Sequence, residues 1–538
     1  MAKKSIKRSE ELKQILHHDH DWSFFGPSWL YWALSPIAVV PQGVVNGIFS
    51  PVPGVTFPVA KFLGIPFARP PQRFSPPVIP GSFASNLYNA TQLKPACIQQ
   101  FNYPEAARAF TLDLFNNPPP ASESEDCLYL NVYAPSAATP ASLLPVMVWI
   151  YGGALQFGSA SSPYYDGSNI AGKQNVIVVT FNYRTNVFGF PNSPELPNIA
   201  QNLGLLDQRL ALAWIRANIL AFGGDPLKVT IFGESAGALS VDALVTSHPI
   251  FPPFRAAIMQ SGQDSVRTLT ATPGLGTVSG TLSWNALAAG LGCSNTGSAL
   301  ACLRAADALT IKSYIEHAGL SFQPVVDNVT RVSNPQLKRS NREIANVPVL
   351  IGSNAQEGSA FVYGQSDITA ALQELFPGNA TLQAEVLATF SVGQDGLNTP
   401  AAVIEQIYTD IIFQCPSAIV ANSSSAAGYP TFRYYYNATF ANIQPVRGLG
   451  AYHSSEIPLV FGNLPSNSTP TEISLSALIQ KSWADFAKNP QTGPGWNRLN
   501  IFAGVNNVAV FNVNGLGSVN GGVLDKRCAV FKYGLGGF

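Results

Sequence analysis

The sequence predicts an α/β protein with a large, mostly parallel central sheet that is covered by helices on both faces. Short β-branched and aromatic runs alternate with helical patterns from about Gln42 to Phe538. The runs are apolar almost throughout, which is typical of strands buried on both faces. Strand–helix–strand order with short connections favours parallel pairing.

Six runs are expected to form strands, and two patterns between or after them are expected to form helices. Leu205–Ile219 places Leu206, Leu210 and Trp214 on one helical face, and Leu475–Lys488 ends shortly before a proline. The expected strands are Val146–Tyr151, Val176–Asn182, Val229–Phe232, Ala256–Gln260, Val347–Ile351 and Phe432–Tyr436.

Composition excludes several classes of protein. The chain has 538 residues, with 31 basic and 31 acidic side chains, and 46% of the residues are hydrophobic. Zero net charge without a basic run argues against a nucleic-acid partner or a polybasic membrane anchor. The apolar fraction is too high for a disordered chain. With no internal repeat, we expect one domain over residues 42–538.

The first 41 residues are expected to lie outside this domain. A polar, mixed-charge stretch, Met1–Asp21, precedes an apolar segment that Pro27 and Pro36 interrupt. Proline removes helical hydrogen bonds, so the segment is a poor transmembrane helix. The stretch is either an atypical signal sequence with its apolar part near Trp29–Val40, an alternative first exon, or a misassigned start.

Six cysteines favour an oxidising compartment and therefore a secreted protein, and six glycosylation sequons are compatible with secretion. No cysteines form a CxxC pair, so no metal site is expected. The number of cysteines is even, and two pairs lie close in the sequence, Cys97 with Cys127 and Cys293 with Cys302, which indicates disulfides. The alternative is six free thiols in a cytosolic protein. The sequons, which also arise by chance in so Asn-, Ser- and Thr-rich a chain, begin at Asn89, Asn328, Asn379, Asn422, Asn437 and Asn467.

The sharpest motif is a G-x-S-x-G turn between a strand and a helix. The strand from Val229 ends in Gly233-Glu-Ser-Ala-Gly237, and a helical pattern follows. In this context the motif is a nucleophile elbow, in which the flanking glycines avoid collisions around a tight turn. Ser235 is therefore the candidate nucleophile.

A serine nucleophile needs a base, and elimination among six histidines favours His453. Three histidines lie within the first 41 residues, His248 ends the elbow's own helix, and His317 falls in an amphipathic stretch. His453 follows a strand and satisfies the chain order of nucleophile, acid, histidine. A structural core histidine is the alternative interpretation.

A carboxylate between Ser235 and His453 must orient the imidazole. Glu357 is the best candidate because it follows an apolar strand, and parallel sheets build sites at the carboxyl ends of their strands. Asp327 and Glu374 also satisfy the chain order, so these alternatives stay open.

The oxyanion requires backbone N–H groups that already point toward it. Trp149–Ala154 is a strand that turns into glycines, as in the HGGG-type loop of this kind of elbow protein. The candidate donors are Gly153, Ala154 and Ala236, and the alternative interpretation of the loop is a plain glycine turn.

Several further motifs, taken in order, resemble the type-B carboxylesterase/lipase family, which includes cholinesterases and fungal secreted lipases. The resemblance covers about Gln42 to Phe538. It rests on Phe62–Pro71, Glu125–Val132, Asn182–Arg184, Gly204–Arg209 and Asn218–Pro226, which leads into the elbow.

The resemblance implies an α/β-hydrolase fold with cap or lid insertions and a serine hydrolase of carboxylic esters that needs no cofactor or metal. It places the triad on Ser235, Glu357 and His453 and the oxyanion donors on Gly153, Ala154 and Ala236. The implied disulfides are Cys97–Cys127, Cys293–Cys302 and Cys415–Cys528. By the same resemblance, Glu234 and Asp126 are structural carboxylates.

The substrate class stays open at this stage between small-molecule and lipid esters. Residues 98–126 are a candidate lid that would contact a lipid interface in a lipase or sterol esterase; the alternative is a structural flap. This segment lacks the tryptophan with which cholinesterases hold a quaternary ammonium, which disfavours choline esters. Ala154 replaces a glycine found in many members. A non-catalytic binding protein on this fold is the remaining alternative, and no oligomeric state is predicted.

Overall fold

The computed structural model describes residues 35–266 and 280–531. Within these residues an 11-stranded sheet has the order β14-β13-β12-β11-β10-β9-β7-β8-β6-β4-β3. The strands from β8 to β13 pair in parallel, and the edge strands pair antiparallel. The bounds are β3 Ile48–Ser50, β4 Val59–Pro66, β6 Tyr129–Pro135, β7 Leu144–Ile150, β8 Ile177–Phe181, β9 Gly224–Glu234, β10 Ala256–Gln260, β11 Val349–Asn354, β12 Thr431–Asn437, β13 Asn507–Asn512 and β14 Gly515–Asn520.

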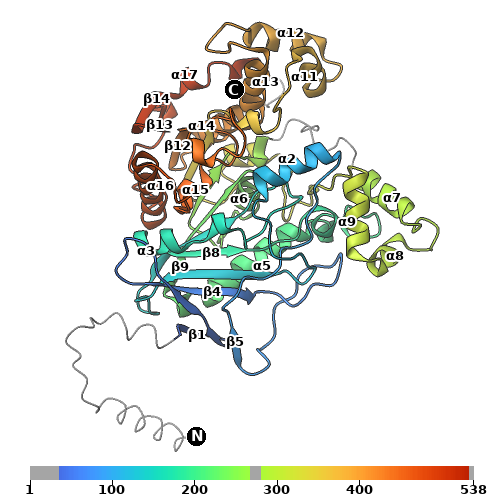
Figure 1. The fold of residues 1–538 in the computed structure, drawn as a ribbon, viewed down its shortest axis with the longest axis vertical. Coiled ribbons are helices and arrows are strands. Elements are labelled where there is room, and N and C mark those ends of the chain that lie inside the picture. The colour runs from blue at the N-terminus through green and yellow to red at the C-terminus, as the bar shows by residue number, and fades with distance from the viewer. Residues whose placement is uncertain (1–34, 267–279, 532–538) are drawn as a thin grey trace, which may run out of the picture.

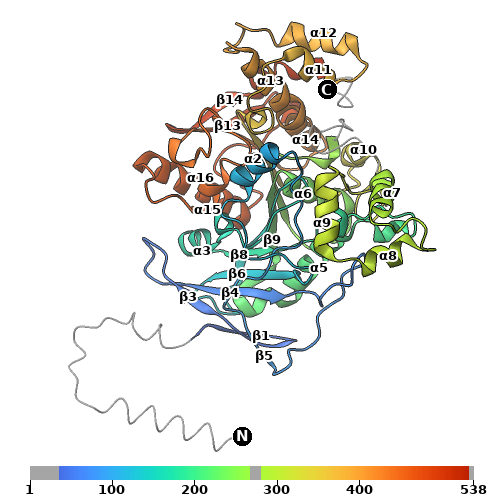
Figure 2. The same cartoon turned by 45° about the vertical axis from the view of Figure 1, so that its right-hand side comes forward.

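Helices cover both faces of this sheet, which confirms the predicted fold class (Figures 1 and 2). α3, α15 and α16 pack together on one face, and α5, α6 and α14 lie on the other. The helices are α2 Glu105–Phe115, α3 Ser168–Gln174, α4 Asn186–Gly189, α5 Leu203–Asn218, α6 Ala236–Ser247, α7 Gly280–Gly290, α8 Ala299–Ala305, α9 Ala308–His317, α10 Pro335–Ser340, α11 Ile368–Leu375, α12 Ala380–Thr389, α13 Pro400–Thr409, α14 Cys415–Ala426, α15 Ile457–Phe461, α16 Pro470–Lys488 and α17 Gly521–Leu524.

Two groups of helices are inserted at the periphery of this framework. α7, α8 and α9 lie together at one side, and α11, α12 and α13 lie together at another end of the molecule (Figures 1 and 2). α2 lies between them and crosses over the region of α6 in both views.

All six predicted strands are present; β10 has the predicted bounds, and the bounds of the other five are shifted. β9 begins at Gly224, earlier than predicted, because Gly224 also pairs with Leu144 of β7, and the register of the two strands shifts before Val229 pairs with Val146. β11 extends through Gly352-Ser-Asn354 because these residues are buried and pair with β12, although their composition is not typical of a strand. α16 also begins earlier than predicted, since Thr469 caps it by accepting a hydrogen bond from the N–H of Glu472.

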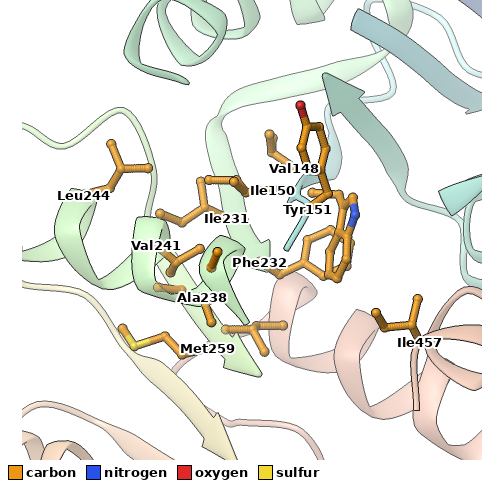
Figure 3. Close-up of a cluster of buried hydrophobic side chains, with 14 of the residues drawn as sticks. Val148, Ile150, Tyr151, Ile231, Phe232, Ala238, Val241, Leu244, Met259 and Ile457 are labelled. Atoms are coloured by element: carbon orange, nitrogen blue, oxygen red, sulfur yellow. The ribbon is translucent and has the colours of Figure 1, made fainter. Parts of the chain in front are cut away.

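The core beneath the elbow is apolar on both sides of the sheet. Figure 3 shows aliphatic and aromatic side chains of β7 and β9 packed against α6, together with Met259 of β10 and Ile457 of α15. None of these side chains is more than a few per cent exposed. Dense packing around β7 and β9 holds the ends of these strands, and therefore the loops that follow them, in fixed positions. The labelled side chains of β7, β9 and α6 are Val148, Ile150, Ile231, Phe232, Ala238, Val241 and Leu244.

A small second sheet contains part of the segment that the sequence analysis placed before the domain. β1 (Ile37–Val40) pairs antiparallel with β2 (Gly43–Asn46), and β2 pairs with β5 (Leu87–Asn89). Side chains of β1 alternate between exposed and buried, so this apolar run is a half-buried strand. Residues 37–40, which precede residue 42, are therefore part of the fold, and residues 1–34 lie outside the described range.

Three disulfides connect the cysteines in the pairs that the family resemblance implies: Cys97–Cys127, Cys293–Cys302 and Cys415–Cys528. The first closes the segment that contains α2. The third joins the start of α14 to the C-terminal region across 113 residues. In the part of the chain that the structure describes, no helix is both long and apolar enough to cross a bilayer.

Candidate active site

Ser235 occupies the tight turn between β9 and α6. Its backbone has φ 55° and ψ −125°, a positive φ that is uncommon for a residue other than glycine. Its N–H donates to the carbonyl of Gln260 over 2.8 Å. The two flanking glycines leave no room for side chains: a Cβ would lie 2.6 Å from the carbonyl oxygen of Ile150 at Gly233 and 2.0 Å from it at Gly237. The motif is thus a strained elbow, as the sequence predicts.

His453 and Glu357 form a buried hydrogen-bonded pair. His453 Nδ1 lies 2.6 Å from Glu357 Oε2, and the other carboxylate oxygen, Oε1, accepts the N–H of Asn354 over 2.6 Å. The side chains of Glu357 and His453 are 0% and 3% exposed. Glu357 follows β11 and His453 follows β12, so two neighbouring parallel strands bring the pair together. The bond to Nδ1 leaves Nε2 as the nitrogen available for proton transfer.

The second ring nitrogen of His453 faces a different carboxylate. Nε2 lies 3.1 Å from Glu234 Oε1 but makes no hydrogen bond within the described residues, and Ser235 Oγ is not bonded to it. Burial by itself would lower the pKa of His453, but the carboxylates of Glu234 and Glu357 outweigh burial and raise that pKa to about 9.

Glu234, which the resemblance implies is a structural carboxylate, and Glu456, for which no role was predicted, extend this cluster. Burial raises the pKa of Glu234 to about 8, and Ser454 Oγ donates to its Oε1 over 2.6 Å. Glu456 accepts from Gln260 Nε2 and Asn354 Nδ2 over 2.9 and 2.7 Å. Two features of the sequence could have indicated this cluster. Glu234 is adjacent to Ser235, and Glu456 lies three positions after His453.

The loop after β7 presents backbone N–H groups beside the elbow. Gly153, Ala154 and Leu155 all have positive φ values of 102°, 56° and 61°. A Cβ at Gly153 would lie 2.4 Å from the carbonyl oxygen of Phe157, so glycine is required there. The N–H groups of Gly153 and Ala154 have no partner among the described residues, and Ala236 supplies the first N–H of α6.

Ser235, Ala236, Gly153, Ala154 and His453 line one cavity of about 1270 Å³. α2 forms part of its wall, and aromatic rings surround the imidazole: Phe413, Phe361 and Phe115 have ring centroids 4.6, 5.1 and 6.3 Å from that of His453. Phe413 belongs to a π-helical turn, Asp410–Gln414, between α13 and α14. No periodicity in the sequence indicated these rings.

The other candidate acids and histidines do not contact the pair of His453 and Glu357. Asp327 accepts hydrogen bonds from Val329, Thr330 and Arg331 in its own turn. Glu374 is exposed and lines the same cavity without a contact to His453. His248 Nδ1 lies 3.0 Å from the carbonyl of Leu244, and His317 stacks on Tyr103 with ring centroids 4.0 Å apart.

Comparison with known proteins shows the family of the chain. The model of the carboxylesterase family matches residues 34–514. The chain belongs to the carboxylesterase family. This match confirms the resemblance found in the sequence, and the protein is a carboxylic ester hydrolase that acts on small-molecule ester substrates.

Relatives of this carboxylesterase come from mammals, bacteria and fungi. It is 35% identical to carboxylesterase 1D of Mus musculus, over 87% of this chain and 88% of the relative. It is 36% identical to para-nitrobenzyl esterase of Bacillus subtilis, over 81% and 87%. It is 33% identical to secreted lipase 5 of Gibberella zeae, over 84% and 86%. The similarity therefore covers most of each protein.

Proposed function

We propose that this carboxylesterase cleaves esters through an acyl-enzyme on Ser235, with His453 as general base and Glu357 as the carboxylate that orients it. The observation that carries the proposal is the 2.6 Å contact between His453 Nδ1 and Glu357 Oε2 beside the elbow. This contact fixes the imidazole tautomer with its proton on Nδ1, so that Nε2 is the nitrogen left to act as a base. Ser235 and His453 line that cavity together.

The reaction proceeds in two halves. Ser235 Oγ attacks the ester carbonyl while His453 Nε2 takes the hydroxyl proton, and the resulting imidazolium is stabilised by Glu357. The oxyanion binds the N–H groups of Gly153, Ala154 and Ala236. The imidazolium then protonates the departing alcohol, and a water deprotonated by His453 releases the acid and restores Ser235.

The acyl chain length of the preferred substrate distinguishes a plain carboxylesterase from an interfacial lipase or sterol esterase. We propose the carboxylesterase, because α2 is held by specific contacts: Phe110 stacks on Tyr363 with centroids 5.3 Å apart, and the N–H of Phe101, before α2, donates to Glu316 Oε1 over 2.9 Å. The half-buried apolar side chains of α2 favour the lid alternative, because a lid that opens would present them to a lipid surface.

Hydrolysis of p-nitrophenyl esters from acetate to palmitate tests this choice. We expect kcat/KM to be highest for short and medium chains and to change smoothly when a substrate exceeds its solubility limit. A rate that jumps above that limit, with a preference for long chains, would instead establish interfacial activation and assign residues 98–126 as a lid.

A second expected result is that the Glu234→Gln variant moves the acid limb of the pH profile of kcat/KM to lower pH. Only neutral imidazole is a base, so activity falls as pH falls through the pKa of His453, and the Glu234 carboxylate raises that pKa. Removing the charge should shift the limb by about one pH unit. Glu374→Gln, at an exposed carboxylate of the same cavity, is the matched control and should leave the limb in place. An unchanged limb in Glu234→Gln would contradict the role given to this charge.

We also propose that the protein is exported and N-glycosylated, which the three disulfides support. Asn422 is the exception among the sequons, because it is half-buried within α14 and its Oδ1 is buried. The exposed candidates are Asn89, Asn328, Asn379, Asn437 and Asn467.

A further inference from the structure

Gln263 is a buried amide that lines the catalytic cavity without any hydrogen-bond partner. It is the third residue after β10, and its side chain is 2% exposed. Neither Nε2 nor Oε1 has a partner. Within residues 35–266 and 280–531, it is the only side chain with two buried polar atoms that both lack a partner.

Such an amide is unfavourable unless something binds it. A buried polar group without a hydrogen bond lowers the stability of the folded state by its full desolvation penalty. Nearly all buried polar groups in native proteins are therefore hydrogen-bonded. The neighbouring Gln260 illustrates the ordinary situation: its Nε2 donates to Glu456 Oε1 over 2.9 Å, and its Oε1 accepts from Trp483 Nε1 over 2.9 Å. Gln263, three residues later, has the same functional group and lines the cavity, but it has no such partners.

The amide lies close to the candidate nucleophile along the backbone. Gly262, the residue before Gln263, touches the elbow so closely that a Cβ there would lie 2.2 Å from the carbonyl oxygen of Ser235. Gln260, two residues earlier, accepts the N–H of Ser235. Gln263 therefore belongs to the wall of the cavity that is built directly on the elbow.

The backbone around Gln263 is anchored on both sides. Before it, the N–H of Ser261 donates to the carbonyl of Gly352 over 2.9 Å. After it, the N–H of Ser265 donates to Asp242 Oδ2 over 2.6 Å, and Arg331 pairs with Asp264. A group held in this way loses little further conformational entropy when it binds a ligand, which is the condition for a selective contact.

We propose that Gln263 is a specificity-determining residue that hydrogen-bonds a hydroxyl group carried by the ester, on its acyl or its alcohol part. A hydroxyl is both donor and acceptor, and the unused Oε1 and Nε2 of a primary amide offer the complementary pair. Ser261 also lines this cavity, and its buried hydroxyl lacks a partner, so a second unpaired polar group lies close to Gln263 in the chain. The inference rests on the proposed role of Ser235.

Paired substrates test the preference in the wild-type enzyme. For the acyl part, methyl butyrate is compared with methyl 2-hydroxybutyrate and methyl 3-hydroxybutyrate; for the alcohol part, propyl butyrate is compared with 2-hydroxyethyl and 3-hydroxypropyl butyrate. Acid release is followed by titration. We expect one arm to show a hydroxy ester favoured in kcat/KM by about ten- to hundredfold, since an ester without the hydroxyl leaves the amide unpaired. Equal kcat/KM values in both arms would overturn the proposal.

Gln263→Met tests whether this residue is the cause. Methionine has a similar shape but cannot form these hydrogen bonds, so the preference should fall to near parity while the unsubstituted esters are hydrolysed within a few-fold of the wild-type rate. Gln365→Met makes the same change at an exposed glutamine that lines the same cavity, and it should retain the preference. If Gln263 binds only a water molecule, Gln263→Met will keep the wild-type selectivity, and the proposal is wrong.

The failure of this inference is distinguishable from failure of the proposed mechanism. If the mechanism is wrong, the Ser235→Ala variant will still hydrolyse methyl butyrate and propyl butyrate. If only the inference is wrong, hydrolysis of these plain esters will depend on Ser235, but the hydroxyl group will have no effect on selectivity. The wild-type comparison does not depend on whether the Gln263→Met variant folds.

Discussion

The Ser235→Ala variant should lose about 10⁴- to 10⁶-fold in kcat for ester hydrolysis and keep its fold. The loss is large because the acyl-enzyme cannot form without the hydroxyl. Stability should change by less than about 1 kcal/mol, for two reasons. The hydroxyl of Ser235 bonds to no described group, and alanine and serine are equally strained at φ 55°. The measurement is the kcat for p-nitrophenyl butyrate, with thermal unfolding followed in parallel.

Ser162→Ala is the matched control for this experiment. Ser162 also lines the cavity, and its hydroxyl makes no hydrogen bond in the described part of the chain, so its removal should leave kcat within a few-fold of the wild-type value. Retained turnover in Ser235→Ala would exclude Ser235 as the nucleophile. Equal losses in both variants would indicate that the cavity, and not one hydroxyl, had been damaged.

The sequence predicted the parts of the site that depend on local geometry. A nucleophile elbow needs small residues two positions on either side of its serine, so Gly233 and Gly237 identify it without any tertiary information. The carboxyl ends of parallel strands meet at one edge of a sheet, so Glu357 after one strand and His453 after another could be expected to meet. In the structure Glu357 follows β11 directly, His453 lies in the longer segment after β12, and His453 Nδ1 is 2.6 Å from Glu357 Oε2.

Other parts of the site depend on packing that no local pattern encodes. Phe413 reaches His453 from a π-helical turn, and Phe115 does so from α2, which lies about 340 residues away in the chain. The pKa shift of His453 also depends on Glu234 lying 3.1 Å from Nε2, a distance that the sequence does not contain. Gln263 is a further example, because glutamine in a loop is unremarkable until its burial and its missing partners are known.

A Gly237→Ala variant should lose about 100-fold in kcat/KM and also become less stable, although the new methyl group touches neither Ser235 nor a substrate. The added Cβ would lie 2.0 Å from the carbonyl oxygen of Ile150 and 2.8 Å from its carbonyl carbon. These are backbone atoms of β7, which cannot turn away as a side chain would. Relief of the contact therefore requires α6 and β7 to separate by about 1 Å, and overpacking of this kind costs about 1–3 kcal/mol.

The activity loss in Gly237→Ala follows from what is attached to the two elements that would move. α6 begins at Ala236, directly after Ser235, while Ile150 ends β7 just before the loop of Gly153 and Ala154. Separation of α6 from β7 therefore moves the nucleophile away from two oxyanion donors, so kcat should fall more than KM rises. Gly81→Ala is the control, because a Cβ there meets no atom within 4 Å, and it should keep wild-type kcat and thermal stability. A fully active Gly237→Ala variant would show that the elbow does not depend on this close approach of α6 to β7.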